Sequence, residues 1–351
     1  MSSSAAGKSH TTGQHTTALP AAVGDEVKIA VVIPCYKIKR HIGGVLSEIP
    51  ADVHNIYCVD DACPQSSGAF ILSEFAADPR VTVIARSSNG GVGAAVISGY
   101  ERAMEDGMDI VIKLDGDGQM DPALIPVLIR PLLAGTADYV KGNRYYSPES
   151  LRGMPMIRKL GNTGLSFLSK LSTGYWHLFD PTNGYTAIDA RVLRLLPLSK
   201  LHRGYFFESD MLFRLNLLRA CAEDIPMNAR YADEKSQLSV SRALLTFPFL
   251  HLRNLLKRIV YNHFLRNFSI ASVELLLGSF LLPFGVINGI LSWMESASSG
   301  EPATAGTVML AALPVIVGVQ FLLNYLAYDF SIVPTRPISN RLAMHFTRRD
   351  S

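Results

Sequence analysis

The sequence has few cysteines and few charged residues, and each shortage excludes a class of protein. Only 4 of the 351 residues are cysteine and none forms a CxxC pair, so neither a disulfide framework nor a zinc site is expected and a reducing compartment is favoured. The formal net charge of +3 gives no reason to expect a nucleic-acid partner. A hydrophobic content of 48% and a mean hydropathy of +0.20 are high for a soluble protein, which predicts contact with lipid.

Residues 1–27 differ in composition from the rest of the chain. They are rich in Ser, Thr, Ala, Gly and His and lack the continuous apolar core of a secretory signal. We expect a disordered tail, in which His10 and His15 are exposed to solvent rather than bound to metal.

From residue 28 to residue 240 the sequence alternates between short apolar runs and helix-like segments. The runs are rich in β-branched residues, which is typical of parallel strands buried on both faces. This alternation predicts a doubly wound, Rossmann-like α/β domain whose ligands bind beyond the carboxyl ends of the strands. The expected strands are Lys28–Pro34, Asn55–Asp61, Arg80–Arg86 and Asp109–Asp117, and the expected helices are Ile42–Ile49, Gly68–Ala77 and Gly93–Asp106.

Turn-forming residues follow each of the expected strands, in the segments Pro34–Tyr36, Asp60–Gly68, Ser87–Ala95 and Asp115–Pro122. Any one of them could be an ordinary turn, because Asp, Asn, Gly and Pro are the residues that turns use. The NGGVG stretch is a weak indication of a phosphate loop and also fits tight packing at a helix start. Four such segments at successive strand ends favour a ligand site.

The carboxylates Asp115 and Asp117 carry more information than the turns. They can face the same ligand if the backbone bends at Gly116, whose missing side chain would also let a ligand approach. Oxygen ligands suit Mg²⁺ or Mn²⁺, which takes few protein carboxylates and completes its shell with water and phosphate oxygens. This DxD pair therefore predicts a metal-bridged diphosphate, in which the metal makes a nucleoside diphosphate a better leaving group.

The motifs of this region resemble those of the family-2 glycosyltransferases with a GT-A fold, and they are most similar to the polyprenyl-phosphate glycosyltransferases, the relatives of dolichol-phosphate mannose synthase and bactoprenol glucosyltransferases. The resemblance covers about residues 28–238. It implies an inverting, metal-dependent transfer of a sugar from a UDP- or GDP-sugar to undecaprenyl or dolichyl phosphate. The motifs are VVIPCY, VDDACPQSSG, NGGVGAA, KLDGDGQMDP, KGNRYY, DPTNGYTA and YFFESDMLFRL.

The resemblance also implies roles for single residues. Asp117 and Gln119 would hold the metal together with Asp115, and arginines would meet phosphate groups, which suits the bidentate geometry of guanidinium. Asp121 is instead expected to cap the helix that starts at Pro122. The implied nucleotide-sugar contacts are Pro34, Tyr36, Asp60, Asp61, Asp115, Asp117 and Lys235; the implied catalytic residues are Asp117, Arg144, Arg158, Arg230 and Asp210; the implied acceptor-phosphate contacts are Arg144, Arg158 and Asn162.

The chain departs from the family pattern at three places. Asn162 stands where the family often has a serine, Lys235 precedes Ser236 in the loop that begins at Arg230, and DDACPQSSG replaces the commoner DDGSxDGT.

Two long apolar segments predict a membrane part at residues 268–330. At about 1.5 Å per residue, Phe268–Trp293 and Gly306–Tyr328 can each cross a core of roughly 30 Å. Basic residues flank the pair but are absent from its linker, which predicts an inner or plasma membrane protein with a cytoplasmic α/β domain, a cytoplasmic tail at 331–351 and both termini cytoplasmic. Residues 241–267 predict an amphipathic helix on the headgroups, with a helix packed on the domain as the alternative.

The acceptor sets the chemistry that the site needs. A lipid monophosphate has a second pKa of about 6, so its oxygen can attack without a general base. A sugar hydroxyl would need a base, for which Glu208 or Asp210 is available, although the QxxRW motif of processive synthases is absent. A non-catalytic membrane subunit that binds a nucleotide sugar is the remaining alternative, and a homo-oligomer is compatible with all three.

Overall fold

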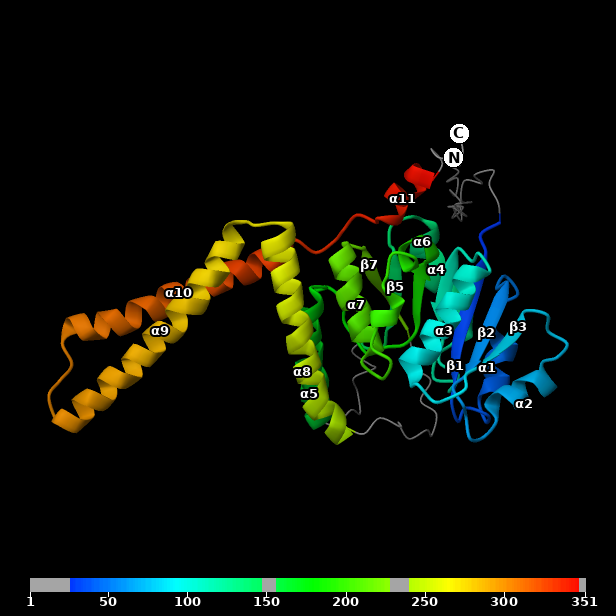
Figure 1. Cartoon of the computed structure of the whole chain (residues 1–351), viewed down its shortest axis with the longest axis horizontal. Helices are drawn as coiled ribbons and strands as arrows, with labels where there is room; N and C mark the ends of the chain where they lie inside the picture. Colours follow the sequence, from blue (N-terminus) through cyan, green and yellow to red (C-terminus); the bar gives the residue numbers. More distant parts are fainter. Residues whose placement is uncertain (1–25, 147–155, 228–239, 347–351) are drawn as a thin grey trace, which may run out of the picture.

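The structure is a computed structural model that describes residues 26–146, 156–227 and 240–346. Its centre is a mixed sheet of seven strands in the order β3-β2-β1-β4-β6-β5-β7, covered by helices on both faces (Figure 1). The strands are β1 (Ile29–Cys35), β2 (Asn55–Asp60), β3 (Val81–Ala85), β4 (Ile110–Lys113), β5 (Tyr139–Asn143), β6 (Thr186–Asp189) and β7 (Ala222–Pro226).

The expected strands and helices of the first half are confirmed, with two differences. Strand β6 runs antiparallel to both β4 and β5, so the sheet is mixed rather than wholly parallel. Strand β4 ends at Lys113 instead of Asp117, which leaves the DxD residues in the loop that follows. The helices of this half are α1 (Ile42–Glu48), α2 (Ser67–Glu74), α3 (Val92–Glu105), η1 (Pro122–Leu124) and α4 (Ile125–Leu133).

The core has two layers because successive side chains of a strand point to opposite faces of the sheet. Val31 and Ile33 of β1 pack on the side of α1, α2 and α4, whereas Ala30 and Val32 pack on the side of α3 and α7. Burial on both faces explains why the strands read as continuous apolar runs.

The second half is mostly helical and joins the domain to a long hairpin. Its elements are α5 (Met156–Thr173), α6 (Ala190–Leu193), η3 (Leu198–Lys200), α7 (Phe207–Leu218), α8 (Val240–Ile259), the π-helix η4 (Val260–Arg266), α9 (Ile270–Ser299), α10 (Ala305–Ser331) and α11 (Ser339–Phe346).

Helices α9 and α10 form an antiparallel hairpin that projects away from the α/β domain (Figure 1). Both are long and apolar enough to cross a membrane, and only 22% and 6% of their most apolar windows are buried inside the protein. A core helix of a soluble protein would be mostly buried, so the exposure of these apolar faces fits two helices that could span a membrane.

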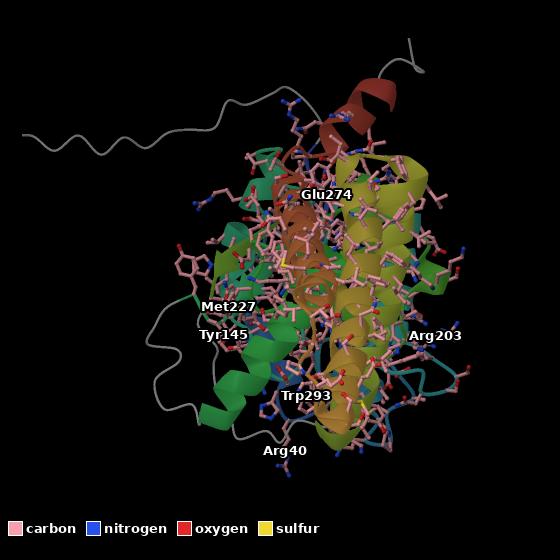
Figure 2. The ribbon with its side chains drawn as sticks, turned by 90° about the vertical axis from the view of Figure 1, so that its left-hand side faces the viewer. Arg40, Tyr145, Arg203, Met227, Glu274 and Trp293 are labelled. Atoms are coloured by element: carbon pink, nitrogen blue, oxygen red, sulfur yellow. The ribbon has the colours of Figure 1, made fainter. Side chains whose placement is uncertain are left out.

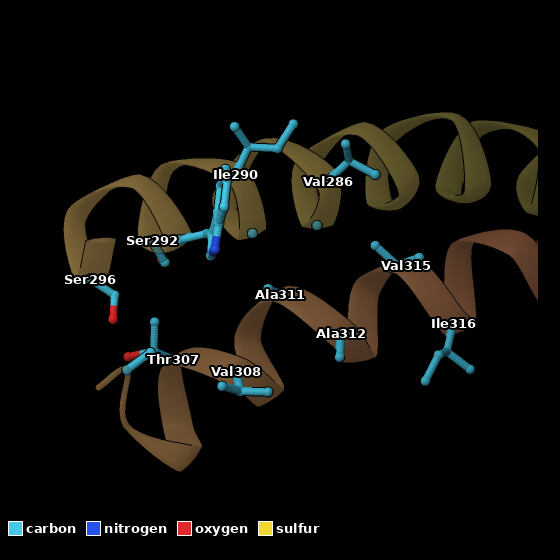
Figure 3. Close-up of a pocket in the computed structure, with 14 residues that line it drawn as sticks. Val286, Ile290, Ser292, Ser296, Thr307, Val308, Ala311, Ala312, Val315 and Ile316 are labelled. Atoms are coloured by element: carbon cyan, nitrogen blue, oxygen red, sulfur yellow. The ribbon is translucent and has the colours of Figure 1, made fainter. Parts of the chain in front are cut away.

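Small residues let the two helices approach closely. A Cβ at Gly285 would lie 2.7 Å from the Ala311 carbonyl oxygen, which is too close for any residue with a side chain. Near the hairpin tip the helices enclose an apolar groove of about 550 Å³ between Val286, Ile290 and Ile316 (Figure 3). This groove is lined by the membrane hairpin alone, far along the chain from the strand ends where ligands of α/β domains bind.

Helix α8 is amphipathic, and its polar side faces the protein. His251, Asn254 and Arg258 are buried, whereas Phe249 and Leu256 are exposed. The helix packs on α5 and α7, as expected for the alternative of a helix packed on the α/β domain. Its apolar face nevertheless points outward. A water-soluble helix would bury the opposite face, which favours a lipid surface as the outer neighbour.

A buried ion pair joins the hairpin to the domain. Arg258 of α8 binds Asp329 of α10 through two hydrogen bonds of 2.7 and 2.9 Å, and both side chains are about 2% exposed. The same carboxylate accepts a hydrogen bond of 2.8 Å from the Trp176 indole, and Arg258 also donates to the Leu171 carbonyl at 2.8 Å. Three segments distant in sequence therefore meet at one carboxylate.

The chain after α10 returns to the domain. The buried carboxylate of Asp138 accepts hydrogen bonds from the backbone N–H groups of Cys221, Ile338 and Ser339 at 2.7 to 2.9 Å. The chain is thus tied to the domain at two places on the C-terminal side of the hairpin, at Asp329 and at Ile338 and Ser339.

We predict that Arg258→Met lowers the stability of the protein by about 3–5 kcal/mol, because it leaves the Asp329 carboxylate buried without its counter-charge. The double variant Arg258→Met/Asp329→Leu should recover most of that loss. Thermal unfolding in detergent micelles measures both, with Arg253→Met, an exposed position on the same helix, as the matched control. An Arg258→Met variant as stable as the control would contradict the role of the pair.

Candidate active site

The candidate site lies at the carboxyl ends of three neighbouring strands. Strands β2, β1 and β4 are adjacent and parallel, so the loops that follow Asp60, Cys35 and Lys113 meet at one edge of the sheet. This edge is where ligands bind in open α/β folds.

A buried lysine connects the elements around this edge. Lys113, the last residue of β4, is 1% exposed, and its Nζ lies 2.7 Å from Asp115 and 3.0 Å from Glu208 of α7. It also donates a hydrogen bond of 3.3 Å to the Gly184 carbonyl. A Cβ at Gly184 would collide with both Lys113 and Asp115, so only glycine fits there. The lysine thereby fixes the loop after β4, helix α7 and the loop at Gly184 relative to one another.

The two carboxylates decide the charge of this lysine. Burial alone would lower the pKa of Lys113, but the charges of Asp115 and Glu208 outweigh burial and raise it above its usual value. Lys113 is therefore a cation at neutral pH, and Asp115 and Glu208 share its charge. Tyr205 lies nearby: burial raises the pKa of its phenol, and Asp115 and Tyr36 raise it further.

The DxD loop is shaped by its own side chains. The Asp117 carboxylate accepts a hydrogen bond of 3.0 Å from the Gln119 N–H, and Gly118 supplies the turn with a φ of +77°. The expectation that Gly116 opens the loop to a ligand was wrong. A Cβ there would collide with Ile38, so Gly116 is required by core packing.

Asp121 is a helix cap, as expected. Its carboxylate accepts a hydrogen bond of 3.0 Å from the Ala123 N–H, and Pro122 occupies the first position of η1. Asp121 is therefore a structural residue, and Asp115 and Asp117 are the two acids of this loop that could hold the metal.

Asp60 and Asp61 organise loops at the same edge. Asp60 accepts hydrogen bonds from the N–H groups of Cys63 and Gly68 at 2.7 and 2.6 Å. Asp61 pairs with Arg86 at 2.9 Å and accepts from the N–H groups of Gly90 and Gly91 at 2.9 and 2.8 Å. Backbone N–H groups of the loop after β2 bind Asp60, and those of the loop before α3 bind Asp61.

The NGGVG stretch packs tightly against another loop instead of forming an open phosphate loop. Gly91 has a φ of +90°, and its Cβ would lie 2.8 Å from the Arg203 carbonyl oxygen. The Ala94 N–H donates to that same oxygen at 3.0 Å. Of the two interpretations of this stretch, the geometry supports close packing at a helix start.

Arg144 follows β5 and is held by a carboxylate that the sequence did not single out. Asp180, 1% exposed, accepts two hydrogen bonds of 2.7 and 2.8 Å from the Arg144 guanidinium. Burial raises the pKa of Asp180, but Arg144 outweighs burial and lowers it. Burial lowers the pKa of the neighbouring Lys141 to about 8, although Asp180 opposes the shift. The guanidinium is 30% exposed and held in one orientation.

The remaining predicted residues divide into three groups. Pro34 and Tyr36 lie at the end of β1, half-buried at the site edge. Asp210 is fully buried and binds the His202 N–H, Arg214 and Asn254 at 3.0 to 3.1 Å, away from the contacts of Lys113. Only the backbone of α5 is described for Arg158 and Asn162, and Arg230 and Lys235 lie outside the described residues.

Lys113, Asp180 and Gly184 had no individual roles among the expectations from the sequence, although Asp180 and Gly184 lie in the DPTNGYTA motif that the resemblance singled out. Lys113 had a signal, because a lysine interrupts an otherwise apolar buried strand directly before the DxD pair. Asp180 and Gly184 lie in a loop whose contact with β4 depends on the antiparallel placement of β6.

The donor set fits a hard cation that takes few protein ligands. Among the described residues, no group of three or more His, Cys, Asp or Glu side chains could hold a metal ion by itself. Asp115, Asp117 and Gln119 are half-buried at the rim, where two carboxylates and an amide leave room for water and phosphate oxygens. The arrangement suits Mg²⁺ or Mn²⁺ bound jointly by protein and diphosphate.

The strand order of this mixed sheet and the acidic loop after its central strand β4 are those of the GT-A fold. This fold is typical of proteins that bind a nucleotide sugar. The sequence model of the family Glycosyl transferase family 2 matches residues 30–196. The chain belongs to this glycosyltransferase family.

Three curated relatives support that membership. The chain is 30% identical over 206 residues to the undecaprenyl-phosphate mannosyltransferase of Micrococcus luteus, covering 57% of this chain and 83% of that protein. It is 32% identical over 204 residues to the polyprenol monophosphomannose synthase of Mycolicibacterium smegmatis, covering 56% and 74%. It is 28% identical over 219 residues to the UDP-N-acetylglucosamine–dolichyl-phosphate N-acetylglucosaminyltransferase of Methanococcus voltae, covering 58% and 86%.

A solved structure supports the fold. The glucosyl-3-phosphoglycerate synthase of Mycobacterium tuberculosis, crystallised with Mn²⁺ and UDP-glucose, superposes with a TM-score of 0.50 at 20% identity. The match covers 66% of this chain and 79% of that one. At this identity the likeness concerns the fold alone.

We predict that Lys113→Met destabilises the protein by about 3–5 kcal/mol and weakens donor binding, because Asp115 and Glu208 lose their shared counter-charge. Arg102→Met is the matched control, since it breaks an exposed pair with Asp106 and should change the stability far less than Lys113→Met. Denaturant unfolding and the KM for the donor measure the two effects. Equal stability of the two variants would refute the role given to Lys113.

Proposed function

We propose that the chain transfers a sugar from a nucleoside diphosphate sugar to a polyprenyl phosphate at a membrane surface, with inversion at the anomeric carbon. Its similarity to the relatives named above supports this acceptor class. The observation that carries the proposal is that both acids that could act as a general base are held in ion pairs. Glu208 is paired with Lys113, and Asp210 is buried against Arg214.

A phosphate acceptor fits a site without an available base. Its oxygen is already largely ionised at neutral pH, since the second pKa of a phosphate monoester is about 6. A glycan hydroxyl would have to lose its proton to a carboxylate, and Glu208 and Asp210 each already bind a cation. The geometry therefore supports the lipid phosphate over the hydroxyl.

The protein would contribute alignment and charge. Arg144, oriented by Asp180, would meet phosphate oxygens, with Arg158 and Arg230 as further phosphate contacts. Pro34, Tyr36, Asp60, Asp61 and Lys235 would surround the nucleotide, whose base and sugar are left open between UDP and GDP donors. Asp117, Gln119 and Asp115 would hold Mg²⁺ or Mn²⁺. The metal would neutralise charge on the departing diphosphate.

The arrangement also supports a topology. Both hairpin ends lie at the catalytic domain, and the flanking segments carry basic residues that the hairpin linker lacks. By the positive-inside rule, the domain and both termini would be cytoplasmic. The outward apolar face of α8 would rest on the headgroups and keep the site near the bilayer.

The direct test is a donor screen. Purified protein in detergent is incubated with Mn²⁺, undecaprenyl or dolichyl phosphate and a panel of radiolabelled UDP- and GDP-sugars. We expect one donor to yield a lipid-linked monosaccharide, detected by mass spectrometry. Failure of every donor with both lipids would sink the proposal, and labelling of an added glycan instead would favour the hydroxyl acceptor.

Two neighbouring aspartates provide a matched test of the metal site. We predict that Asp117→Ala lowers metal-dependent turnover on the order of 100-fold or more while the protein stays folded and membrane-bound. Asp121→Ala should lose about 1 kcal/mol of stability by removing the helix cap, with unchanged Mn²⁺ dependence. Turnover and Mn²⁺ titration measure both variants. Normal turnover of Asp117→Ala would remove the metal assignment.

A further inference from the structure

A series of aromatic side chains, with one lysine among them, leads from Arg144 to the foot of the hairpin. The Arg144 guanidinium lies 5.7 Å from the ring of Tyr145, and that ring lies 6.2 Å from Phe179. The Lys170 Nζ lies 5.0 Å over the Phe179 ring. These contacts connect the loop after β5 to helix α5.

The series continues along α5 to α10. Phe167 is three residues before Lys170 on the same helix, so the two side chains share one face. The Phe167 ring lies 6.2 Å from Trp176, and Trp176 stacks on Phe330 of α10 at 3.9 Å. We call this set of side chains the aromatic track; its members are Tyr145, Phe179, Lys170, Phe167, Trp176 and Phe330.

Three rings of the track are exposed: Phe167, Phe179 and Phe330 are 52%, 41% and 48% exposed. Trp176, which joins Phe167 to Phe330, is only 6% exposed and packs beneath them. Figure 2 shows the side chains of the described residues from the hairpin side and labels Tyr145. Single exposed apolar residues are common on proteins, but a connected row of them indicates a binding surface.

The two ends of the track identify its ligand. One end is a guanidinium held in place by Asp180, which suits a phosphate. The other end is the last turn of a helix that can cross a membrane. A molecule that needs a cation at one end, an apolar surface in the middle and a bilayer at the far end is an isoprenoid lipid phosphate.

We propose that the aromatic track binds the isoprene units nearest the phosphate of the lipid acceptor, guiding them from the bilayer at Phe330 to Arg144. The inference rests on the proposed function and adds the path of the lipid chain. Flat rings suit a branched, unsaturated chain because they offer a large apolar area at low conformational cost. The order along the track places Phe179 near the phosphate and Phe167 farther from it.

This order gives a graded test with two acceptors, undecaprenyl phosphate and the two-isoprene citronellyl phosphate, in the same micelles. Phe167→Ala should raise the KM for the long acceptor about tenfold, which is the effect of losing one aromatic contact. The KM for the short acceptor should be unchanged, because that lipid does not reach Phe167. Phe179→Ala should raise both. Phe167→Tyr keeps the ring and should behave as wild type.

Leu72→Ala is the matched control, because Leu72 is an exposed apolar residue on α2, outside the track. The KM for the donor should be unchanged in all variants. Crosslinking of undecaprenyl phosphate by a photoreactive phenylalanine at position 167, and not at position 72, gives a readout that does not depend on turnover.

The outcomes separate the two proposals. If the wild type transfers sugar to the lipid but Phe167→Ala keeps the wild-type KM for the long acceptor, the track proposal alone is overturned. If the wild type transfers sugar to neither acceptor, the proposed function fails and the track proposal fails with it.

Discussion

The buried pair between Arg258 and Asp329 is the interaction on which the arrangement of this enzyme depends. Two charges removed from water stay stable only while they compensate each other, so the foot of α10 is fixed on the catalytic domain. That contact determines how the apolar hairpin is placed relative to the sheet. The outward apolar face of α8, the returning chain at Asp138 and the exposed rings beside Trp176 all follow from the same placement.

A second buried cation, Lys113, holds the elements of the site together, as Arg258 holds the hairpin on the domain. Lys113 joins β4, α7 and the loop at Gly184, and it shares its charge between two acids. This sharing has a chemical consequence, because Glu208 is engaged by Lys113 instead of being free to meet a hydroxyl. A phosphate that arrives ionised avoids the need for one. The electrostatics of the site and the proposed lipid acceptor therefore agree.

The chemistry and the membrane impose one common requirement: a charged reaction must take place beside hydrocarbon. The structure meets this requirement by keeping the charged side chains and the apolar surfaces in separate regions. Carboxylates, Lys113 and Arg144 gather at the carboxyl edge of the sheet, whereas α8, α9 and α10 present apolar faces outward. The aromatic track connects the two regions, because aromatic rings are compatible with both a cation and an isoprenoid chain.

The sequence by itself determined whatever depends on local pattern and on residue type. Strands β1 to β4, their helices, the cap at Asp121 and the two spans could all be predicted, because apolar periodicity and capping act over a few residues. Pairing partners were decided only by the tertiary structure. The reversed direction of β6, the bond from Asp180 to Arg144 and the packing role of Gly116 arise between segments far apart in the chain, where no local signal reports which residue will be the neighbour.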